Sequence, residues 1–359
     1  MFDKAIVKNI KRETEDSVVV SLSLADDTAH KYKYKQGQNL TFIREFDKEE
    51  LRRSYSICSS VNDAELRVGI KQIVGGRFST WANTELQVGD EVSLLPPAGD
   101  FYTDLDAATK RGYVGIAAGS GITPILSILK TTLETELESS FTLIYGNKST
   151  DTIMFLEEIE DLKNRYRERF QVFNVLSQEV QNAELLNGRI DGEKIQQFLQ
   201  NLVPAEQVDH VFLCGPFDMV MSAQDAFLKA GINKSNIHTE LFGTPEDLAA
   251  IASQQAPMLS EDEAQHVSQL TVMIDGKGSK LSLARGGDSI LDAALKIRKD
   301  LPFACKGGVC ATCKAKVIEG DVSMDLNYSL SDEEVAQGFV LTCQSHPVSD
   351  TVVIDYDQK

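Results

Sequence analysis

The sequence predicts a multidomain fold in which an antiparallel β-barrel is followed by an α/β domain with a parallel sheet and then by a small α+β domain. Three observations predict it. The chain has 359 residues, which is enough for two or three domains. Its hydrophobic pattern changes period near residue 105, and the stretch 246–266 contains few aromatic or β-branched residues. We therefore expect domains over 1–104, 105–245 and 267–359, with 246–266 as a linker that includes at most a short helical stretch.

The first region consists of short segments in which apolar and polar residues alternate, as they do in half-buried strands. Glycine, asparagine and aspartate separate these segments. Six short strands at near-regular spacing predict an antiparallel barrel. The expected strands are Phe2–Ile10, Val18–Leu24, Gln38–Ile43, Arg53–Cys58, Glu65–Ile73 and Glu91–Leu95.

In the second region, apolar runs typical of buried strands alternate with segments of helical period. This order predicts a parallel sheet with helices on both faces. The expected strands are Gly112–Ala118, Phe141–Tyr145, Gln171–Leu176, Val211–Cys214 and a last strand that ends near Glu240. The expected helices are Ile122–Leu133, Ile153–Arg167, Lys194–Leu202 and Met219–Ala230.

The third region predicts a small α+β domain around a cysteine-rich loop. A hairpin over Leu270–Ile274 and Lys280–Leu283 precedes a helix over Ser289–Arg298, and strands around Lys314–Ile318 and Thr351–Tyr356 follow the loop.

Composition narrows the classes of function. The formal net charge of −18 disfavours general nucleic-acid binding, which needs a basic face. The sequence has no run of roughly 20 apolar residues, so we expect no membrane insertion. Its first residues lack the apolar core of a signal peptide, which favours the cytoplasm. Six cysteines are too few for a disulfide scaffold of this length.

Four of the cysteines carry the strongest signal. The spacing Cys305-x4-Cys310-x2-Cys313, with Cys343 in a later segment, is typical of plant-type [2Fe–2S] proteins. A loop that curls around a cluster needs small residues, and this loop reads CKGGVCATC. The alternatives are a structural zinc site or four reduced cysteines in the core. Zinc sites usually present two paired knuckles, whereas the fourth cysteine here stands alone.

The chain resembles a known family, the ferredoxin-NADP reductase superfamily with a C-terminal plant-type ferredoxin domain. The resemblance rests on the runs LRRSYSIC, AAGSGITPIL, TLIYGN, GRIDGEK, CKGGVCATCK and NYSL. It covers essentially the full length and is weakest in 1–35 and in the linker. It implies an FAD-binding barrel, an NAD(P)-binding α/β domain and a β-grasp ferredoxin domain. It also implies that Cys305, Cys310, Cys313 and Cys343 hold the cluster.

Two segments of the barrel match the family's flavin motifs. Arg53-Ser54-Tyr55-Ser56 matches R-x-Y-S, in which an arginine fork suits a pyrophosphate and a tyrosine ring suits the flavin face. Serine can bond near the reactive nitrogen of the flavin. Taken alone, this segment is more typical of a surface strand with alternating polar residues. The second element comprises Ile70, Lys71, Gly76, Arg77, Phe78 and Ser79, and backbone amides at the start of a helix from about Ser79 would face phosphate.

Three segments of the α/β domain match nicotinamide motifs. Gly119-Ser120-Gly121-Ile122-Thr123-Pro124 joins a strand to a helix, where a phosphate cradle is expected, although a lone G-x-G is usually only a tight turn. By resemblance, Thr123 lies near the nicotinamide. Cys214-Gly215-Pro216 ends a strand, and the cysteine is expected beside the nicotinamide unless it is only a small buried residue. Glu240 and Phe242 are expected at the flavin edge; alternatively, Glu240 is an exposed carboxylate at a strand end.

The choice of nucleotide depends on an extra phosphate, which NADPH carries and NADH lacks. Many NADP-using reductases place a Ser-Arg pair after the middle strand, whereas this chain has Ser177-Gln178. Arg189 or Lys148 is the candidate substitute for the missing arginine. The resemblance favours NADPH, with NADH as the alternative.

The resemblance implies an electron-transfer flavoenzyme with Ser56, Cys214 and Glu240 as its catalytic residues. NAD(P)H would deliver a hydride to FAD, and electrons would then pass singly through the [2Fe–2S] cluster to a separate di-iron oxygenase component. A reductase for another multicomponent mono- or dioxygenase is the first alternative. A non-catalytic redox sensor is a more distant one, and the ordered presence of all three cofactor motifs argues against it.

Overall fold

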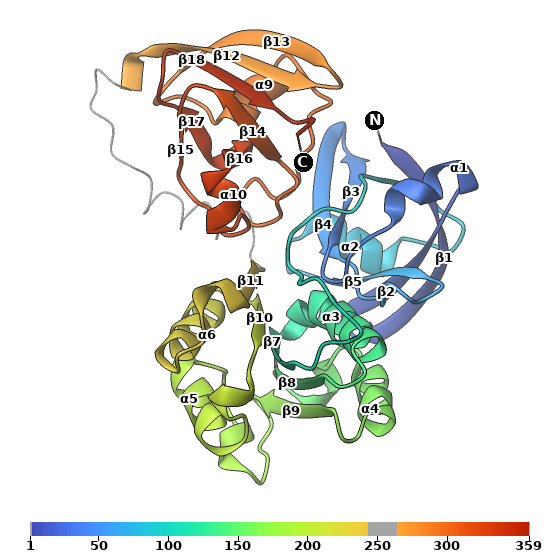
Figure 1. Ribbon diagram of the computed structural model, residues 1–359. Helices are drawn as coiled ribbons and strands as arrows, with labels where there is room; N and C mark the ends of the chain where they lie inside the picture. Colours follow the sequence, from blue (N-terminus) through green and yellow to red (C-terminus); the bar gives the residue numbers. More distant parts are fainter. Residues whose placement is uncertain (1, 243–263, 359) are drawn as a thin grey trace. The chain divides into compact units, whose positions relative to one another are not determined.

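The computed structural model describes residues 2–242 and 264–358, which form two compact units (Figure 1). We call them the reductase unit, formed by Phe2–Pro97 and Phe101–Phe242, and the ferredoxin unit, formed by Ala98–Asp100 and the described residues from Ala264 onward. The linker expected over 246–266 falls mostly on residues 246–263, which lie outside the described residues. The bounds given above for the three domains and the linker therefore stay predictions.

The first part of the reductase unit is a six-stranded antiparallel sheet with the order β4-β3-β6-β1-β2-β5. A bridge between Ile57 and Val68 joins the two outer strands, β4 and β5, and so closes the sheet into a barrel. The strands are β1 (Asp3–Thr14), β2 (Ser17–Leu24), β3 (Asn39–Phe46), β4 (Glu49–Ser56), β5 (Leu66–Lys71) and β6 (Glu91–Leu94). All six correspond to segments expected from the alternating pattern.

The barrel core contains residues two positions apart on the same strand, as side chains on one face of a strand are. Leu40 and Phe42 of β3 belong to it, as do Val68 and Ile70 of β5, although Thr41 and Gly69 between them are buried too. Helix α2 (Arg77–Thr84) packs against these residues through Phe78 and Trp81. The short helices α1 (Asp26–Ala29) and η1 (His30–Tyr32) connect β2 to β3.

The second part of the reductase unit is a five-stranded parallel sheet with the order β11-β10-β7-β8-β9. Its strands are β7 (Gly112–Ala118), β8 (Ser140–Asn147), β9 (Phe170–Leu176), β10 (His210–Gly215) and β11 (Ile237–Leu241). Helices α3 and α4 lie on one side of the sheet and α5 and α6 on the other (Figure 1). This sandwich explains why β7 and β10 are nearly continuous apolar runs.

The helices of this domain follow the expected periodic segments. They are α3 (Ile122–Thr135), α4 (Leu156–Arg165), α5 (Gly192–Asn201) and α6 (Phe217–Lys229), with the single turns η2 (Gly119–Gly121), η3 (Thr150–Thr152), η4 (Glu184–Leu186), η5 (Ala205–Gln207) and η6 (Lys234–Asn236). The chain leaves β7 toward β8 and returns on the other side to β10. The carboxyl ends of β7 and β10 therefore form the topological switch point, where ligands of such sheets bind.

The ferredoxin unit contains a mixed five-stranded sheet with the order β13-β12-β18-β14-β16. Its strands are β12 (Val267–Ile274), β13 (Lys277–Ala284), β14 (Lys314–Glu319), β16 (Phe339–Leu341) and β18 (Thr351–Asp355), and β15 (Val322–Met324) pairs separately with β17 (Ser345–Pro347). The helices are α9 (Ile290–Leu295), α10 (Asp332–Ala336) and the turn η7 (Thr342–Gln344). Strands β12 and β18 run parallel, and the other pairs in the five-stranded sheet are antiparallel.

Two details of this unit differ from the expectation. Helix α9 spans Ile290–Leu295 and is capped by the Ser289 side chain, so it is shorter than the expected Ser289–Arg298. Four further elements were not predicted, because segments of three to five residues are too short to show a period: β15, β16, β17 and α10.

Candidate redox sites

The R-x-Y-S segment lies on β4, beside β3. Tyr55 packs its ring against Phe78 of α2, with ring centroids 5.6 Å apart, and meets Phe42 edge-on at 5.7 Å. Burial raises the pKa of the Tyr55 phenol above its ordinary value, so the ring stays neutral. Arg53 donates to the carbonyl oxygen of Arg52 at 2.7 Å, and the Ser54 and Thr41 hydroxyls lie 3.2 Å apart.

The second flavin segment forms the turn before α2. The backbone N–H of Ile73 donates to the Ser79 hydroxyl at 3.1 Å, and that hydroxyl donates to the Gly76 carbonyl at 3.3 Å. A Cβ on Gly76 would come within 2.6 Å of the Ser79 hydroxyl oxygen, so a larger residue there would displace that hydroxyl. Helix α2 begins at Arg77, two residues before the expected start, and its first backbone amides form a site suited to an anion.

Three of the predicted flavin residues, Ile70, Lys71 and Arg77, make other contacts in this structure. The Ile70 side chain is fully buried in the barrel core. Lys71 lies 3.3 Å from a carboxylate oxygen of Asp16, and Arg77 pairs with Glu49 at 2.6 Å. In this arrangement both cations are held by acidic groups of the barrel.

The loop after β7 packs tightly against the end of β10. A Cβ on Gly121 would lie 2.2 Å from the Cys214 carbonyl oxygen, and Gly119 has a φ of +53°. The Thr123 hydroxyl donates to the Ser120 carbonyl at 3.0 Å, which ties the first turn of α3 to the loop. Pro124 is tolerated in this turn because the first N–H groups of a helix have no partner within the helix.

Three residues predicted to be catalytic meet inside the reductase unit. Strand register places Cys214 of β10 directly opposite Glu240 of β11, with the sulfur 3.9 Å from a carboxylate oxygen. The Ser56 hydroxyl, from the barrel, donates to the same carboxylate oxygen at 3.4 Å. All three side chains are buried, so Glu240 is not an exposed carboxylate, as the alternative interpretation would have it. Burial, and then the charge of Glu240, raise the pKa of the Cys214 thiol well above its ordinary value, so it stays protonated.

The neighbours of Cys214 shape the same end of the sheet. Gly215 has a φ of +155°, and its carbonyl accepts from the N–H of Phe242 at 3.0 Å. Pro216 is the N-cap of α6, and the Phe242 ring packs against the core of the α/β domain.

The residues expected to decide between the nucleotides lie at the carboxyl ends of β8 and β9. The N–H of Ser177 donates to the Asn147 carbonyl at 3.0 Å, and the N–H of Gln178 donates to the Lys148 carbonyl at 2.8 Å. The N–H of Gly188 donates to the Leu176 carbonyl at 2.8 Å, which brings the segment before Arg189 alongside β9. The side chains of Lys148, Ser177 and Arg189 are exposed.

The four clustered cysteines lie close enough to shift one another's pKa values. Hydrogen bonding between Cys305 and Cys310 lowers the pKa of the Cys310 thiol to about 6 and raises that of Cys305 well above its ordinary value. Hydrogen bonding to Cys313 raises the pKa of Cys343 well above its ordinary value. Two thiolates per iron is the ligand set of a [2Fe–2S] cluster, so the residues fit that group. Among residues 2–242 and 264–358, no three His, Cys, Asp or Glu side chains are placed to share one metal ion.

The backbone of the cysteine loop is adapted to its curl. Lys306, Gly308 and Ala311 all have a positive φ, near +54°, +73° and +51°. The N–H of Gly307 donates to the Cys305 sulfur at 3.3 Å. Backbone amides that face sulfur are the kind of support that orients cluster ligands.

Two contacts of the nicotinamide end were missed by the sequence analysis. Gly69 of β5 is so close to α3 that a Cβ there would lie 2.8 Å from the Thr123 methyl carbon. The Tyr145 hydroxyl donates to the Gly119 carbonyl at 2.9 Å. The run TLIYGN contains Tyr145 and offered a signal, whereas nothing in the sequence marks Gly69.

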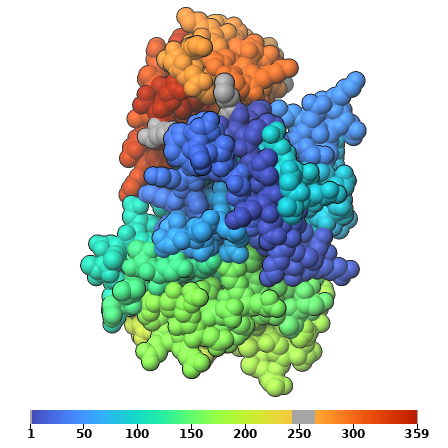
Figure 2. All heavy atoms as spheres, turned by 90° about the vertical axis from the view of Figure 1, so that its right-hand side faces the viewer, coloured from blue at the N-terminus to red at the C-terminus, as the bar shows by residue number. Residues whose placement is uncertain are grey.

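A band of ionic contacts fastens the barrel to the α/β domain, whose residues adjoin without a break in Figure 2. Lys130 of α3, which is only 7% exposed, bridges Asp63 and Glu158, each at 2.7 Å. Arg67 of β5 also binds Glu158, at 2.9 Å. Because Arg67 and Gly69 lie on the same strand, this network fixes β5 against α3.

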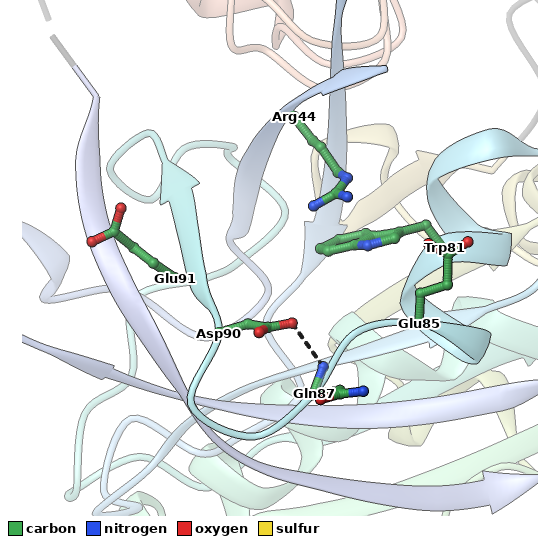
Figure 3. Close-up of a pocket in the computed structure, with 6 residues that line it drawn as sticks. All are labelled: Arg44, Trp81, Glu85, Gln87, Asp90 and Glu91. Carbon is green, nitrogen blue, oxygen red and sulfur yellow. Dashed lines mark hydrogen bonds between the residues drawn. The ribbon is translucent and has the colours of Figure 1, made fainter. Parts of the chain in front are cut away.

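The barrel also has a surface pocket of about 370 Å³, shown in Figure 3. Here the Arg44 guanidinium lies over the Trp81 ring, 4.0 Å from its centroid, and the Asp90 carboxylate accepts from the N–H of Gln87 at 2.9 Å. The pocket is lined by Arg44, Trp81, Glu85, Gln87, Asp90 and Glu91. No predicted flavin residue is among them.

Fold and sites together define a redox protein with a flavin barrel, a nucleotide-binding sheet and a cysteine-cluster domain. Known sequence families match each part: an oxidoreductase FAD-binding domain over residues 4–102, an oxidoreductase NAD-binding domain over 116–225, and a 2Fe-2S iron-sulfur cluster binding domain over 272–348. The chain belongs to the ferredoxin-NADP reductase superfamily with a C-terminal ferredoxin domain. It is an oxidoreductase whose cofactors are FAD, a [2Fe–2S] cluster and a nicotinamide nucleotide, as the motifs predicted.

Similar proteins match the chain over most of its length. The chain is 42% identical over 358 residues to a subunit of the 1,2-phenylacetyl-CoA epoxidase of Escherichia coli K12, and the match covers 100% of this chain and 98% of that subunit. It is 32% identical to the ferredoxin reductase component of 3-ketosteroid-9-alpha-monooxygenase from Mycobacterium tuberculosis H37Rv, with 91% and 86% covered. The structure of phthalate dioxygenase reductase matches with a TM-score of 0.58 and 21% identity over 99% of this chain and 98% of that one. This last likeness confirms the fold class.

The described residues 2–242 and 264–358 include no helix that is both long and apolar enough to cross a membrane.

Proposed function

We propose that the protein is an NAD(P)H-dependent reductase that passes single electrons to a separate oxygenase, and that this oxygenase is a di-iron phenylacetyl-CoA 1,2-epoxidase acting in phenylacetate degradation. The observation that carries the proposal is the 42% identity to the Escherichia coli epoxidase subunit through all three domains. When bound, FAD accepts a hydride from the nicotinamide and a [2Fe–2S] cluster carries one electron at a time. The protein's own residues hold, orient and shield these groups.

Reconstitution tests this function. Purified holo-protein is mixed with the oxygenase subunits of a phenylacetyl-CoA epoxidase, and consumption of phenylacetyl-CoA is measured against oxidation of the nicotinamide. Turnover that requires this protein supports the proposal. Rapid reduction of artificial acceptors, with no turnover when the oxygenase is present, contradicts it.

A reductase for another multicomponent oxygenase is the second candidate. It is favoured by the similarity to the ketosteroid monooxygenase component and to the glycine betaine monooxygenase reductase subunit of Chromohalobacter salexigens, which is 28% identical over 323 residues. The same assay with those oxygenases distinguishes the two candidates.

The flavin site is proposed from the two barrel segments. Arg53 and the amides at the start of α2 would bind the diphosphate, since both offer donors suited to phosphate oxygens. Tyr55 would offer its ring to the flavin. In this role Lys71 and Arg77 must exchange their present carboxylate partners for phosphate.

The nicotinamide end is proposed from the buried contact of Ser56, Cys214 and Glu240. The neutral Cys214 thiol would provide a small apolar surface for the ring, and a nucleophilic role is not implied. Glu240 accepts a hydrogen bond from Ser56 and would orient the carboxamide or hold a proton at its carboxylate oxygen. The diphosphate of the nicotinamide nucleotide would lie against Gly119 to Pro124, together with Gly215 and Pro216. Phe242 would lie at the flavin edge.

NADPH is proposed as the preferred donor, with its extra phosphate bound by Lys148, Ser177 and Arg189. The backbone register that aligns the ends of β8 and β9 supports this grouping. Arg189→Ala and Lys148→Ala should each raise the KM for NADPH by about tenfold, the loss of one charge-assisted hydrogen bond, and leave that for NADH unchanged. Glu179, which accepts hydrogen bonds from Thr150, is an acidic residue close to Ser177, and Glu179→Gln is the matched control. A wild-type preference for NADH contradicts the assignment.

We also propose that the protein works in the cytoplasm. Its described cysteines are all free, and a reducing compartment keeps such thiols available for a cluster.

A further inference from the structure

Two buried hydroxyl groups lie directly behind the cysteine loop of the ferredoxin unit. Thr342, which immediately precedes Cys343, is fully buried, and its hydroxyl donates to the Cys313 carbonyl at 3.0 Å. The N–H of Thr342 is also 3.3 Å from that carbonyl oxygen. The Tyr356 hydroxyl lies 2.6 Å from the Thr342 hydroxyl.

The direction of this hydrogen-bond chain follows from counting protons. A threonine hydroxyl has one proton to donate. Because Thr342 gives its proton to the Cys313 carbonyl, Tyr356 must be the donor of the 2.6 Å bond. The order of donation is therefore Tyr356 to Thr342 to Cys313.

The chain of bonds joins three segments that are distant in sequence. Tyr356 follows β18 and is anchored by its N–H, which donates to the Met273 carbonyl of β12 at 3.0 Å. Cys313 lies just before β14, whereas Cys343 lies in η7 after β16. The hydroxyl and the N–H of Thr342 both reach the Cys313 carbonyl, so Cys313 is bonded to the residue that immediately precedes Cys343.

We propose that Tyr356 and Thr342 are positioning residues for the iron–sulfur cluster. Their hydrogen-bond chain holds the backbones of Cys313 and Cys343 together and so fixes the pair of thiolates that these segments offer to the cluster. The proposal rests on the assignment of the four cysteines as ligands. It gives the C-terminal segment a role in cluster retention that the cysteine motif does not reveal.

The matched control is another buried hydroxyl of the same segment. Ser345 is fully buried two residues beyond Cys343 and donates to the Leu341 carbonyl at 2.8 Å, but it does not reach Cys313. Ser345→Ala therefore removes a buried hydrogen bond from the same region without breaking the chain.

The test compares full-length holo-proteins carrying Tyr356→Phe, Thr342→Val, Thr342→Ser or Ser345→Ala. Release of iron to a chelator and the circular dichroism of the oxidised cluster are measured for each. Tyr356→Phe should release iron roughly threefold to tenfold faster, the factor expected from one lost hydrogen bond of ordinary net strength. Thr342→Val should release it faster still and alter the cluster's circular dichroism. Thr342→Ser, which keeps the hydroxyl, should behave like the wild type.

Equal acceleration in Ser345→Ala and Tyr356→Phe would overturn the proposal, because it would show a general effect of buried hydroxyls. Loss of the cluster in Thr342→Ser as well as in Thr342→Val would also overturn it and assign the effect to packing. If the wild-type protein contains no inorganic sulfide, the assignment of the four cysteines as cluster ligands is itself wrong. If the wild type holds the cluster and Tyr356→Phe releases iron at the wild-type rate, only the positioning role is wrong.

Discussion

The nicotinamide end of the reductase unit and the cysteine loop of the ferredoxin unit both contain buried cysteines, yet the pKa values of Cys214 and Cys310 shift in opposite directions. Cys214 faces a carboxylate, and burial raises its pKa. Cys310 is equally hidden but accepts a hydrogen bond from Cys305, which lowers its pKa to about 6. The difference teaches that burial keeps a lone thiol neutral, whereas neighbouring thiols shift one another's pKa values in opposite directions, down for Cys310 and up for Cys305.

The largest effect is expected for Cys310, which is one of the proposed cluster ligands. Cys310→Ala should abolish the cluster absorbance and the reduction of one-electron acceptors that depend on the cluster. Flavin content and reduction of ferricyanide by NADPH should persist, because the FAD segments lie in the reductase unit. Visible spectra and the two acceptor assays check this. Joint loss of flavin and cluster would show that the two units depend on each other for folding.

The next largest effect is expected for Cys214, whose thiol is neutral. Cys214→Ala should slow flavin reduction by NADPH roughly tenfold to a hundredfold, the usual penalty for misplacing reactants by about 1 Å. The cluster spectrum should be unchanged. Rapid-mixing measurement of flavin reduction checks this. A second readout is alkylation, since unmodified Cys214 should resist iodoacetamide at neutral pH; rapid alkylation at Cys214 would contradict its raised pKa.

The same desolvation acts on a histidine of the parallel sheet. Burial, and then His210, lower the pKa of His238 from 6.5 to about 4, while the two ring nitrogens lie 3.3 Å apart. The unfolded chain therefore binds a proton to this residue before the folded chain does, so stability decreases as pH falls from about 6.5 to about 4. The loss should reach up to about 3 kcal/mol.

Amide exchange in β10 and β11 as a function of pH measures that loss. His238→Gln should flatten the dependence, whereas His266→Gln should not, because His266 lies half-exposed in the ferredoxin unit. An equal slope in wild type and His238→Gln would show that other groups cause the acid sensitivity.

The smallest effect tests how closely the nicotinamide end is packed. Gly69→Ala places a methyl group 2.8 Å from the Thr123 methyl carbon, and this overpacking should cost about 1 to 2 kcal/mol in the stability of the reductase unit. Gly278→Ala is the control, since the nearest atom to its added Cβ is 3.6 Å away. Thermal unfolding of both variants, followed through flavin release, checks the difference. Equal thermal stability of the two variants would mean that the contact between β5 and α3 adjusts easily to the added methyl group.

The two regions also differ in how far the sequence revealed them. Cluster ligands share one loop and a fixed spacing, so the sequence alone predicts Cys305, Cys310 and Cys313 as a set. The approach of Ser56 to Glu240 joins residues 184 positions apart, and only the resemblance to a family suggested it. Gly69, Thr342 and Tyr356 could not be found at all, because their roles arise from contacts between distant strands. Long periodic segments of the barrel and the parallel sheet were predicted well, whereas three-residue strands such as β16 carry too little pattern.

The central claim is that one chain takes a hydride, which carries two electrons, from a nicotinamide and delivers those electrons one at a time. Anaerobic rapid mixing of the holo-protein with NADPH, with flavin and cluster absorbance followed separately, tests it most directly. The account predicts that flavin reduction comes first and cluster reduction follows, and that Cys310→Ala retains only the first phase. Cluster reduction at an undiminished rate in protein stripped of FAD would contradict it.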